Sequence, residues 1–232
     1  MTEEELQQSK TAEVYIKKHK NLLIEKFASE KDYVPDVHPV SLFMAGSPGA
    51  GKTEVSKRLI EEFENKPVRI DADEIRSMFD GYTGMNAHIF QVACTIGVHK
   101  LYDYVLKNEL NTILDGTFAY AKALENVDRS IRRNREVRIY YLYQEPVLAW
   151  EITKKREALE HRHVSKEVFI EAFFRARENA EGAKETFGDR VKLNLIIKNA
   201  KEGTDEIIIN ISRIDQFLKV RYTVDILKKQ LI

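Results

Sequence analysis

One glycine-rich stretch of the sequence has the residue types and the spacing of a phosphate-binding loop. Gly46, Gly49 and Gly51 allow the backbone to turn tightly, which brings successive N–H groups against an anion. Lys52 can reach the outer phosphates of a nucleotide, and the Thr53 hydroxyl can hold Mg2+. We therefore expect ATP or GTP, with Mg2+, to bind at the Gly-x-x-x-x-Gly-Lys-Thr motif made of Gly46, Ser47, Pro48, Gly49, Ala50, Gly51, Lys52 and Thr53.

The residues around this motif predict the strand and the helix that such a loop requires. The apolar run 42–45 precedes the loop, and a helical pattern begins directly after it with Glu54, Val55 and Leu59. The N-terminus of that helix adds about half a positive charge aimed at the same anion. A glycine-rich turn can match the motif by chance, but the strand before it and the helix after it favour a nucleotide site.

A second short strand, 68–70, is followed by Asp71, Asp73 and Arg76. Ligands of open α/β sheets bind outside the carboxyl ends of the strands, so these three side chains are candidates for contact with a substrate. Asp73 is the best candidate for a base that accepts a proton. The alternative is that Asp71 or Asp73 caps the helix that begins at Glu74. One aspartate can cap the helix while the other takes part in the reaction.

A third apolar strand, 111–114, ends at Asp115, Gly116 and Thr117. A strand that ends in an acid, downstream of a phosphate-binding loop, has the position of a Walker B carboxylate. We therefore predict that Asp115 either holds Mg2+, together with Thr53, or orients a substrate. Thr117 is predicted to contact that substrate.

A basic segment, 146–166, is predicted to be helical. Arg156 and Arg162 would lie one to two turns apart on this helix, so both could contact one ligand. In that case the segment forms a cationic lid over the transferred phosphate. The competing interpretation is a solvent-facing helix with Glu–Lys pairs.

Composition limits the class of protein. A chain of 232 residues suffices for one domain with a proper core. Basic and acidic residues number 37 each, which argues against a nucleic-acid-binding protein. The acidic N-terminus is no secretory signal, and no apolar run reaches the about 20 residues of a membrane span, so we expect a cytoplasmic protein. The single cysteine, Cys94, excludes an internal disulfide, and its apolar neighbours predict a buried helical thiol.

Together, the loop, the strand-end acids and the basic segment are the parts of a small-molecule phosphotransferase. Phosphoryl transfer requires that the phosphates are held, that their charge is neutralised, and that an acceptor hydroxyl lies in line near a base. Lys52, Arg156 and Arg162 supply the positive charge, and Asp73 is the predicted base.

Strands alternate with helices along the chain, which predicts an α/β fold with a parallel sheet sandwiched by helices. We divide the chain into an N-terminal helix and linker, 1–40, and a P-loop kinase domain, 41–232, which includes the basic helical lid and a possible last strand at 207–211. Residues 1–28 predict one amphipathic helix, which either packs on the flank of the domain or acts as a regulatory arm. Its apolar face would contain Val14, Tyr15, Leu22, Leu23 and Phe27.

Two further features have ordinary structural interpretations. His88 and His99 lie about three turns apart on a long predicted helix, too far to share a metal, so we expect ordinary helix residues. The predicted helix 119–135 ends in four arginines, Arg129, Arg132, Arg133 and Arg135. Because the chain has no net positive charge, we interpret them as a solvated helix end rather than as a patch that binds nucleic acid.

These motifs together resemble the zeta-toxin kinase family over roughly residues 40–200. The resemblance is carried by the loop 46–53, the D-x-D-x-x-R element 71–76, the strand 114–117 and the pair Arg156 and Arg162. It implies a P-loop kinase-like fold and the phosphorylation of a UDP-activated sugar, such as UDP-N-acetylglucosamine, at a sugar hydroxyl. ATP or GTP would be the donor.

The resemblance also implies roles for single residues. Asp73 would be the general base, Lys52 the P-loop lysine, Arg156 and Arg162 the arginines that clamp the phosphate, and Asp115 an acid of the substrate site. It implies a small helical antitoxin as partner, or inhibition in cis by a segment such as helix 1–28.

The sequence departs from the family pattern at three places. Asp115 stands where the family commonly has Glu, and residues 163–166 read His-Val-Ser-Lys where the family commonly has Ala-Thr-Pro-Lys. The segment 77–86, where substrate contacts are expected, matches weakly.

Two other functions are open on the sequence alone. The same kinase could act on a nucleoside, a dinucleotide cofactor, an antibiotic or a polynucleotide end, although zero net charge argues against the last. A nucleotide-binding regulatory protein without transfer activity is the third possibility. Asp73 and the arginine pair argue against it.

Overall fold

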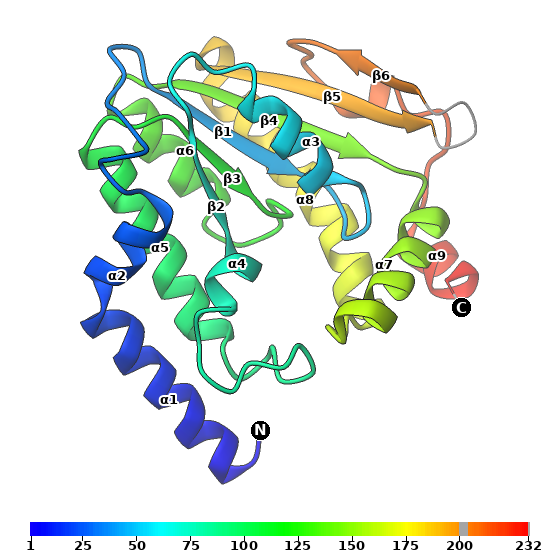
Figure 1. Cartoon of the computed structure of the whole chain (residues 1–232). Coiled ribbons are helices and arrows are strands. Elements are labelled where there is room, and N and C mark those ends of the chain that lie inside the picture. The colour runs from blue at the N-terminus through cyan, green and yellow to red at the C-terminus, as the bar shows by residue number, and fades with distance from the viewer. Residues whose placement is uncertain (200–203, 232) are drawn as a thin grey trace.

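The computed structural model describes residues 1–199 and 204–231; residues 200–203 and 232 of the predicted kinase domain lie outside the described part. Within it, a six-stranded sheet has the order β2-β3-β1-β4-β5-β6 (Figure 1). Its first five strands are parallel and β6 is antiparallel to β5. The predicted α/β fold with a parallel sheet is confirmed. The strands are β1 (Val40–Ala45), β2 (Val68–Asp71), β3 (Thr112–Asp115), β4 (Glu136–Tyr143), β5 (Val191–Asn199) and β6 (Thr204–Ile208).

The edge strand β6 runs antiparallel to β5 because the connection between the two strands is short. Only residues 200–203 separate the end of β5 from the start of β6. A parallel neighbour needs a crossover of a dozen or more residues, whereas an antiparallel neighbour needs only a short turn. The last strand therefore turns back along β5 and begins earlier than the predicted range 207–211.

Helices cover both faces of the sheet. The helix α3 (Lys52–Ile60) packs with the β1 side chains Leu42 and Met44 on one face, while Phe43 and Ala45 face a larger cluster on the other. That second face is covered mainly by α5 (Gln91–Lys107), α6 (Ala123–Ile131) and α8 (Lys166–Phe187) (Figure 1). The other α-helices in the described part of the chain are α1 (Glu3–Lys18), α2 (Lys20–Phe27), α4 (Ala72–Arg76), α7 (Pro146–Glu160) and α9 (Val224–Gln230).

The N-terminal segment forms two helices where one was predicted. The first ends at His19, whose backbone leaves the helical region and whose ring stacks on Tyr15. Both helices pack against α5, in agreement with the flank-packing interpretation. The predicted apolar face is only partly right, because Val14 is 64% exposed and Leu22 is 47% exposed, while Ile16 is fully buried. The break at His19 rotates α2 relative to α1, so one helical periodicity cannot describe both.

Arg135 corrects the prediction of a solvated helix end. The helix α6 already stops at Ile131, and a left-handed residue, Asn134, turns the chain back toward the sheet. Arg135 is then buried, and it donates to the carbonyl oxygens of Val40 at 2.9 Å and Leu110 at 2.5 Å. Burial lowers the pKa of this guanidinium to about 10. Arg135 therefore ties β1 to its neighbours and offers nothing to a nucleic acid.

Among the described residues, no helix combines the length and the apolar character needed to cross a membrane. The predicted buried thiol is confirmed, because Cys94 lies on α5 without solvent exposure. Burial raises the pKa of the Cys94 thiol to about 11, above its usual value of 9.0.

We expect the Cys94 thiol to react slowly with iodoacetamide or a disulfide reagent in the native protein. A shift of the pKa from 9.0 to about 11 lowers the thiolate fraction at pH 8 about 100-fold, and burial blocks access as well. A raised pKa stabilises the fold while the thiol is protonated, and this contribution is lost as the pH rises from 9 through 11. Rates of Cys94 modification measured from pH 7 to pH 10, with and without denaturant, test the expected slow reaction of the thiol. A native rate equal to that of the unfolded chain would contradict burial.

Candidate functional site

The predicted phosphate-binding loop lies directly at the end of β1. Gly46, Gly49 and Gly51 all have positive φ, and left-handed Gly51 is the N-cap of α3. The loop therefore delivers its backbone N–H groups and the helix N-terminus to one point. Lys52 is the first residue of α3, and its Nζ donates to the carbonyl oxygen of Ser47 at 2.6 Å.

The loop glycines are also required by close packing. A Cβ atom on Gly46 would lie 2.5 Å from the carbonyl oxygen of Leu142, and one on Gly49 would lie 2.1 Å from that of Ala149. The N–H of Gly46 also donates to the carbonyl oxygen of Thr117 at 3.1 Å. The loop is thus held between the end of β4, the helix α7 and the segment after β3.

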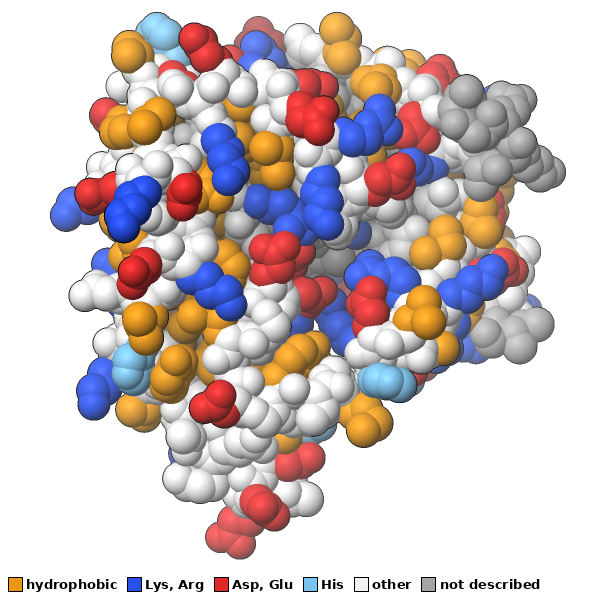
Figure 2. Space-filling view, viewed as in Figure 1, with side chains coloured by type: hydrophobic (Ala, Val, Ile, Leu, Met, Phe, Trp, Pro, Cys, Tyr) orange, Lys and Arg blue, Asp and Glu red, His pale blue; other side chains and the backbone are white. Residues whose placement is uncertain are grey.

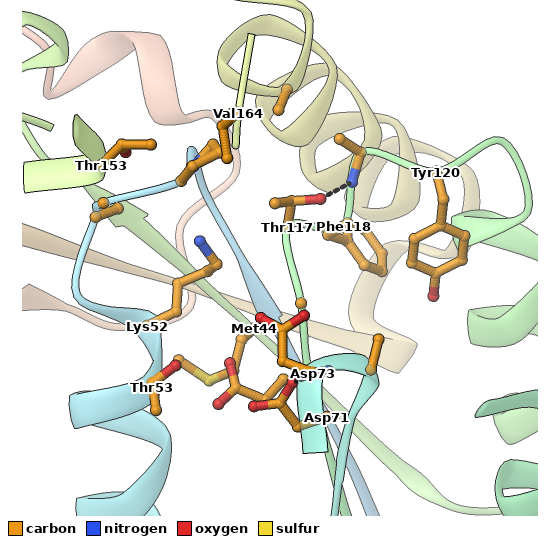
Figure 3. Close-up of a pocket in the computed structure, with 18 of the residues that line it drawn as sticks. Met44, Lys52, Thr53, Asp71, Asp73, Thr117, Phe118, Tyr120, Thr153 and Val164 are labelled. Atoms are coloured by element: carbon orange, nitrogen blue, oxygen red, sulfur yellow. Dashed lines mark hydrogen bonds between the residues drawn. The ribbon is translucent and has the colours of Figure 1, made fainter. Parts of the chain in front are cut away.

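A cavity of about 890 Å³ opens beside this loop. In the space-filling view it is a hollow between α4 and α7 with basic and acidic side chains around it (Figure 2). Lys52, Asp71 and Asp73 point into it from one side, and Thr117 and Tyr120 line another part (Figure 3). The sequence-predicted residues that line the cavity are Pro48, Gly49, Ala50, Gly51, Lys52, Thr53, Asp71, Asp73, Arg76, Asp115, Thr117, Arg156 and Arg162. Gly46 and Ser47 form the base of the loop and do not line it.

Asp73 is held between two arginines. One carboxylate oxygen accepts a hydrogen bond from Arg76 and the other accepts one from Arg162. Arg76 is itself 2% exposed and also donates to Gln91 of α5 at 2.9 Å. These contacts orient the carboxylate of Asp73 toward the cavity.

Asp71 caps the helix that follows β2. Its Oδ1 accepts a hydrogen bond from the N–H of Asp73 at 2.8 Å, so the cap interpretation applies to Asp71 and leaves Asp73 for the cavity. Burial, together with the nearby charges of Asp73 and Asp115, raises the pKa of Asp71 to about 6.

Asp115 is buried at the end of β3 and shares one partner, Arg69, with Asp71. Its Oδ2 accepts hydrogen bonds from the Ser56 hydroxyl at 2.6 Å and from Arg69 Nε at 2.9 Å. Arg69 also forms an ion pair with Asp71, at 2.6 Å. The two aspartates are paired in register on neighbouring strands, which explains why one arginine reaches both.

Lys52 lines the cavity beside the loop. Burial lowers the pKa of its ammonium to about 8; Asp115 and Asp71 act in the opposite direction, and Arg156 and Arg162 add to the lowering. At pH 7 the ammonium is still mostly protonated.

The lid differs from the continuous helix that was predicted. The helix α7 ends at Glu160, and His161 in the left-handed region turns the chain away. Arg162 therefore lies in a connecting loop, while Arg156 lies on α7 in an ion pair with Glu160 at 3.1 Å. Both arginines nevertheless line the cavity, as predicted.

A comparison with protein families identifies the chain. The family model described as Zeta toxin matches residues 24–210. This chain belongs to the zeta toxin family. The family consists of P-loop, nucleotide-binding phosphotransferases, so the resemblance found in the sequence is confirmed at the level of the family. A search of curated proteins gave no significant match.

Solved structures show the zeta-toxin fold in other proteins. A structure from the PezAT toxin-antitoxin system of Streptococcus pneumoniae aligns with a TM-score of 0.62 at 15% identity, covering 100% of this chain and 88% of that one. The complex of AvrRxo1-ORF1 and AvrRxo1-ORF2 solved with ATP aligns with a TM-score of 0.61 at 12% identity, covering 98% of this chain and 78% of that one. At these identities the similarity establishes the fold alone.

Several cavity residues of this zeta-toxin family member were missed in the sequence. Gln91, Thr95 and His99 lie on one face of α5 and reach the cavity, although His99 was interpreted as an ordinary helix residue. Their spacing of four residues was a usable signal, since it places polar groups on one face of an otherwise apolar helix. Tyr120 and Asn126, which are hydrogen-bonded to each other at 3.1 Å, had no such signal.

The predicted metal ligands fit a nucleotide-bound Mg2+. Thr53 and Asp115 both line the cavity beside the loop. Mg2+ is usually bound by one or two carboxylates together with phosphates and waters, so a hydroxyl and one carboxylate form a suitable set. No cluster of three or more His, Cys, Asp or Glu residues that could hold a metal by itself occurs in 1–199 and 204–231.

We expect Gly49→Ala to weaken ATP binding at least about 10-fold, because the new methyl group meets the Ala149 carbonyl and the backbone is strained at φ +73°. Gly182→Ala is the matched control: Gly182 lies on α8 and does not line the cavity, and its Cβ would meet only Leu124 of α6, at 3.9 Å. Isothermal titration of both variants with ATP measures the effect. Equal affinities would show that α7 does not constrain the loop.

Proposed function

We propose that this protein is a kinase that transfers the γ-phosphoryl group of ATP to a hydroxyl of a UDP-activated sugar. The observation that supports it best is the convergence of Lys52, Asp73 and Arg162 on one cavity from three separate parts of the chain. A phosphate-binding lysine, a carboxylate and a lid cation are the groups that phosphoryl transfer needs in one place. ATP is the proposed donor because a structurally similar complex was solved with ATP.

In the proposed reaction, the acceptor oxygen attacks the γ-phosphorus, and its proton passes to Asp73. The bond between the γ-phosphorus and the bridging oxygen breaks, and ADP leaves with that oxygen. Lys52, Arg156 and Arg162 offset the negative charge that develops on the moving phosphoryl group. Thr53 and Asp115 would hold the Mg2+ that neutralises the β- and γ-phosphates when the nucleotide is bound.

The contacts of Asp73 support the proposal that it is the base. Arg76 and Arg162 fix the orientation of this carboxylate, and a base must be aimed at the acceptor hydroxyl before it can accept the proton. A nucleotide switch without transfer activity has no need of a carboxylate held in this way. Asp73 therefore supports the enzyme rather than the regulatory alternative.

The acceptor is assigned by family and by the character of the cavity. A volume of about 890 Å³ lies near the upper end for ligand pockets, as expected of a site for a nucleotide and a second substrate. Beyond Asp73 it is lined by Thr95, His99, Tyr120 and Asn126, whose polar groups suit a substrate rich in hydroxyl groups. These features favour a nucleotide sugar over an apolar acceptor.

We also propose an antitoxin as protein partner. The PezAT structure comes from a toxin-antitoxin system, and this chain has the same fold. Among the described residues that line the cavity, none belongs to α1 or α2. Inhibition in cis by these helices therefore has no support from their position, and a separate chain is the better candidate.

We expect Asp73→Asn to lower phosphoryl transfer by about 10²–10⁴-fold while ATP still binds, because the amide cannot accept the proton. Purified protein, Mg-ATP and a panel of UDP-sugars are incubated, and the products are analysed by mass spectrometry. Lys52→Ala is the control that loses transfer through weaker phosphate binding.

A UDP-sugar that gains one phosphate only with the wild-type protein supports both reaction and acceptor. If the wild type modifies no UDP-sugar but does modify a nucleoside, a dinucleotide cofactor or an antibiotic, the reaction stands and the acceptor is wrong. If Asp73→Asn transfers phosphate at the wild-type rate, Asp73 is not the base.

A further inference from the structure

Two carboxylates lie side by side at the cavity edge of the sheet. Asp71 at the end of β2 and Asp115 at the end of β3 are partners in register on adjacent parallel strands. Both line the cavity beside the phosphate-binding loop. A pair of neighbouring carboxylates is a common ligand set for a hard divalent cation.

Arg69 occupies the position between these two carboxylates. Its Nη2 lies 2.6 Å from Asp71 Oδ2 and 2.6 Å from Asp115 Oδ2, and its Nε lies 2.9 Å from the same oxygen of Asp115. A third carboxylate, that of Glu74, accepts from Nη1. Strand periodicity explains the arrangement, because residues 69 and 71 of β2 point to the same side of the sheet.

Arg69 acts from behind the cavity rather than inside it. Its side chain is 9% exposed, and it is not among the residues that line the cavity, whereas Asp71 and Asp115 are. Burial opposes the charged form, but Asp115, Asp71 and Glu74 together raise the pKa of Arg69 above its ordinary value. The guanidinium is therefore a fixed positive charge that neither titrates nor exchanges with solvent cations.

We propose that Arg69 closes the Asp71–Asp115 pair to free divalent cations, so that metal enters this site only with the phosphates of the nucleotide. One guanidinium nitrogen contacts an oxygen of each carboxylate and so occupies the space between the two side chains. The oxygen Oδ1 of Asp115 has no hydrogen-bond partner within 1–199 and 204–231, so it remains available to a nucleotide-bound ion. Arg69 is thus a positioning residue that acts through Asp115.

The proposal deepens the proposed kinase function, but its test needs neither acceptor nor turnover. Mn2+ alone is titrated into the full chain at pH 7.5 and free Mn2+ is followed by electron paramagnetic resonance. This pH lies above the pKa of about 6 for Asp71, so the Asp71 carboxylate is mostly ionised. Wild-type protein is expected to bind Mn2+ weakly, and Arg69→Gln at least about 10-fold more tightly, because removal of the guanidinium leaves the two carboxylates without their shared cation.

Three variants make the result specific. Arg69→Lys retains the charge and is expected to behave like the wild type. Arg69→Gln combined with Asp115→Asn is expected to lose the gained affinity. Arg58→Gln removes a different arginine, which pairs with Asp205 at 3.7 Å outside the carboxylate pair, and is expected to change nothing. Circular dichroism and thermal unfolding establish that each variant is folded.

Two results overturn the proposal. One is that the wild type binds Mn2+ tightly without nucleotide and that Asp115→Asn abolishes this binding, which would show that the carboxylate pair is already open to the free ion. The other is a folded Arg69→Gln variant that binds Mn2+ no better than the wild type. If Arg69→Gln does not fold, the wild type and Arg69→Lys decide, since both must bind Mn2+ only weakly in the absence of nucleotide. A failure of the UDP-sugar assignment leaves these measurements unchanged.

Discussion

The balance of charge at the carboxyl edge of β1, β2 and β3 is the constraint on which the site depends. Asp71, Asp73 and Asp115 gather there, and buried carboxylates are costly unless they are paired and hydrogen-bonded. Arg69 and Arg76 supply permanent partners from within the fold. Lys52 differs, because in the described part of the chain it forms no ion pair and donates only to a carbonyl oxygen. Its charge is the one that an incoming phosphate can satisfy best.

The backbone around the phosphate-binding loop depends on the same edge. The loop can present its N–H groups only if it fits between β4, α7 and the segment after β3, and two glycines make that fit possible. Arg135 fixes the other end of β1 through the carbonyls of Val40 and Leu110. Packing at one end of β1 and hydrogen bonds at the other thus hold the strand that carries the loop.

Local signals predicted the parts of the fold and site that local sequence determines. The loop motif, the strand-end aspartates and the alternation of strands and helices each depend on neighbouring residues, and the structure confirms them. The roles of Arg69 and Arg135 could not be predicted, because each has an essential partner on another strand: Asp115 is 46 residues from Arg69, and Val40 is 95 residues from Arg135. The end of α7 was missed for a different reason. A left-handed His161 is uncommon, and no glycine marks the turn. The roles assigned to Asp73, Arg156 and Arg162 stay predictions.

The phosphate donor was easier to infer from the sequence than the phosphate acceptor, because the two are recognised by different kinds of groups. A polyphosphate is bound by backbone N–H groups, a lysine and a helix N-terminus, and these must come from one contiguous segment. The proposed acceptor side would be built from single side chains on different elements, such as His99 on α5 and Asn126 on α6. A hydroxyl-rich substrate can be held by many such combinations, so no short motif encodes it. The acceptor of this zeta-toxin family member is therefore a property of the tertiary structure, and only product analysis can identify it.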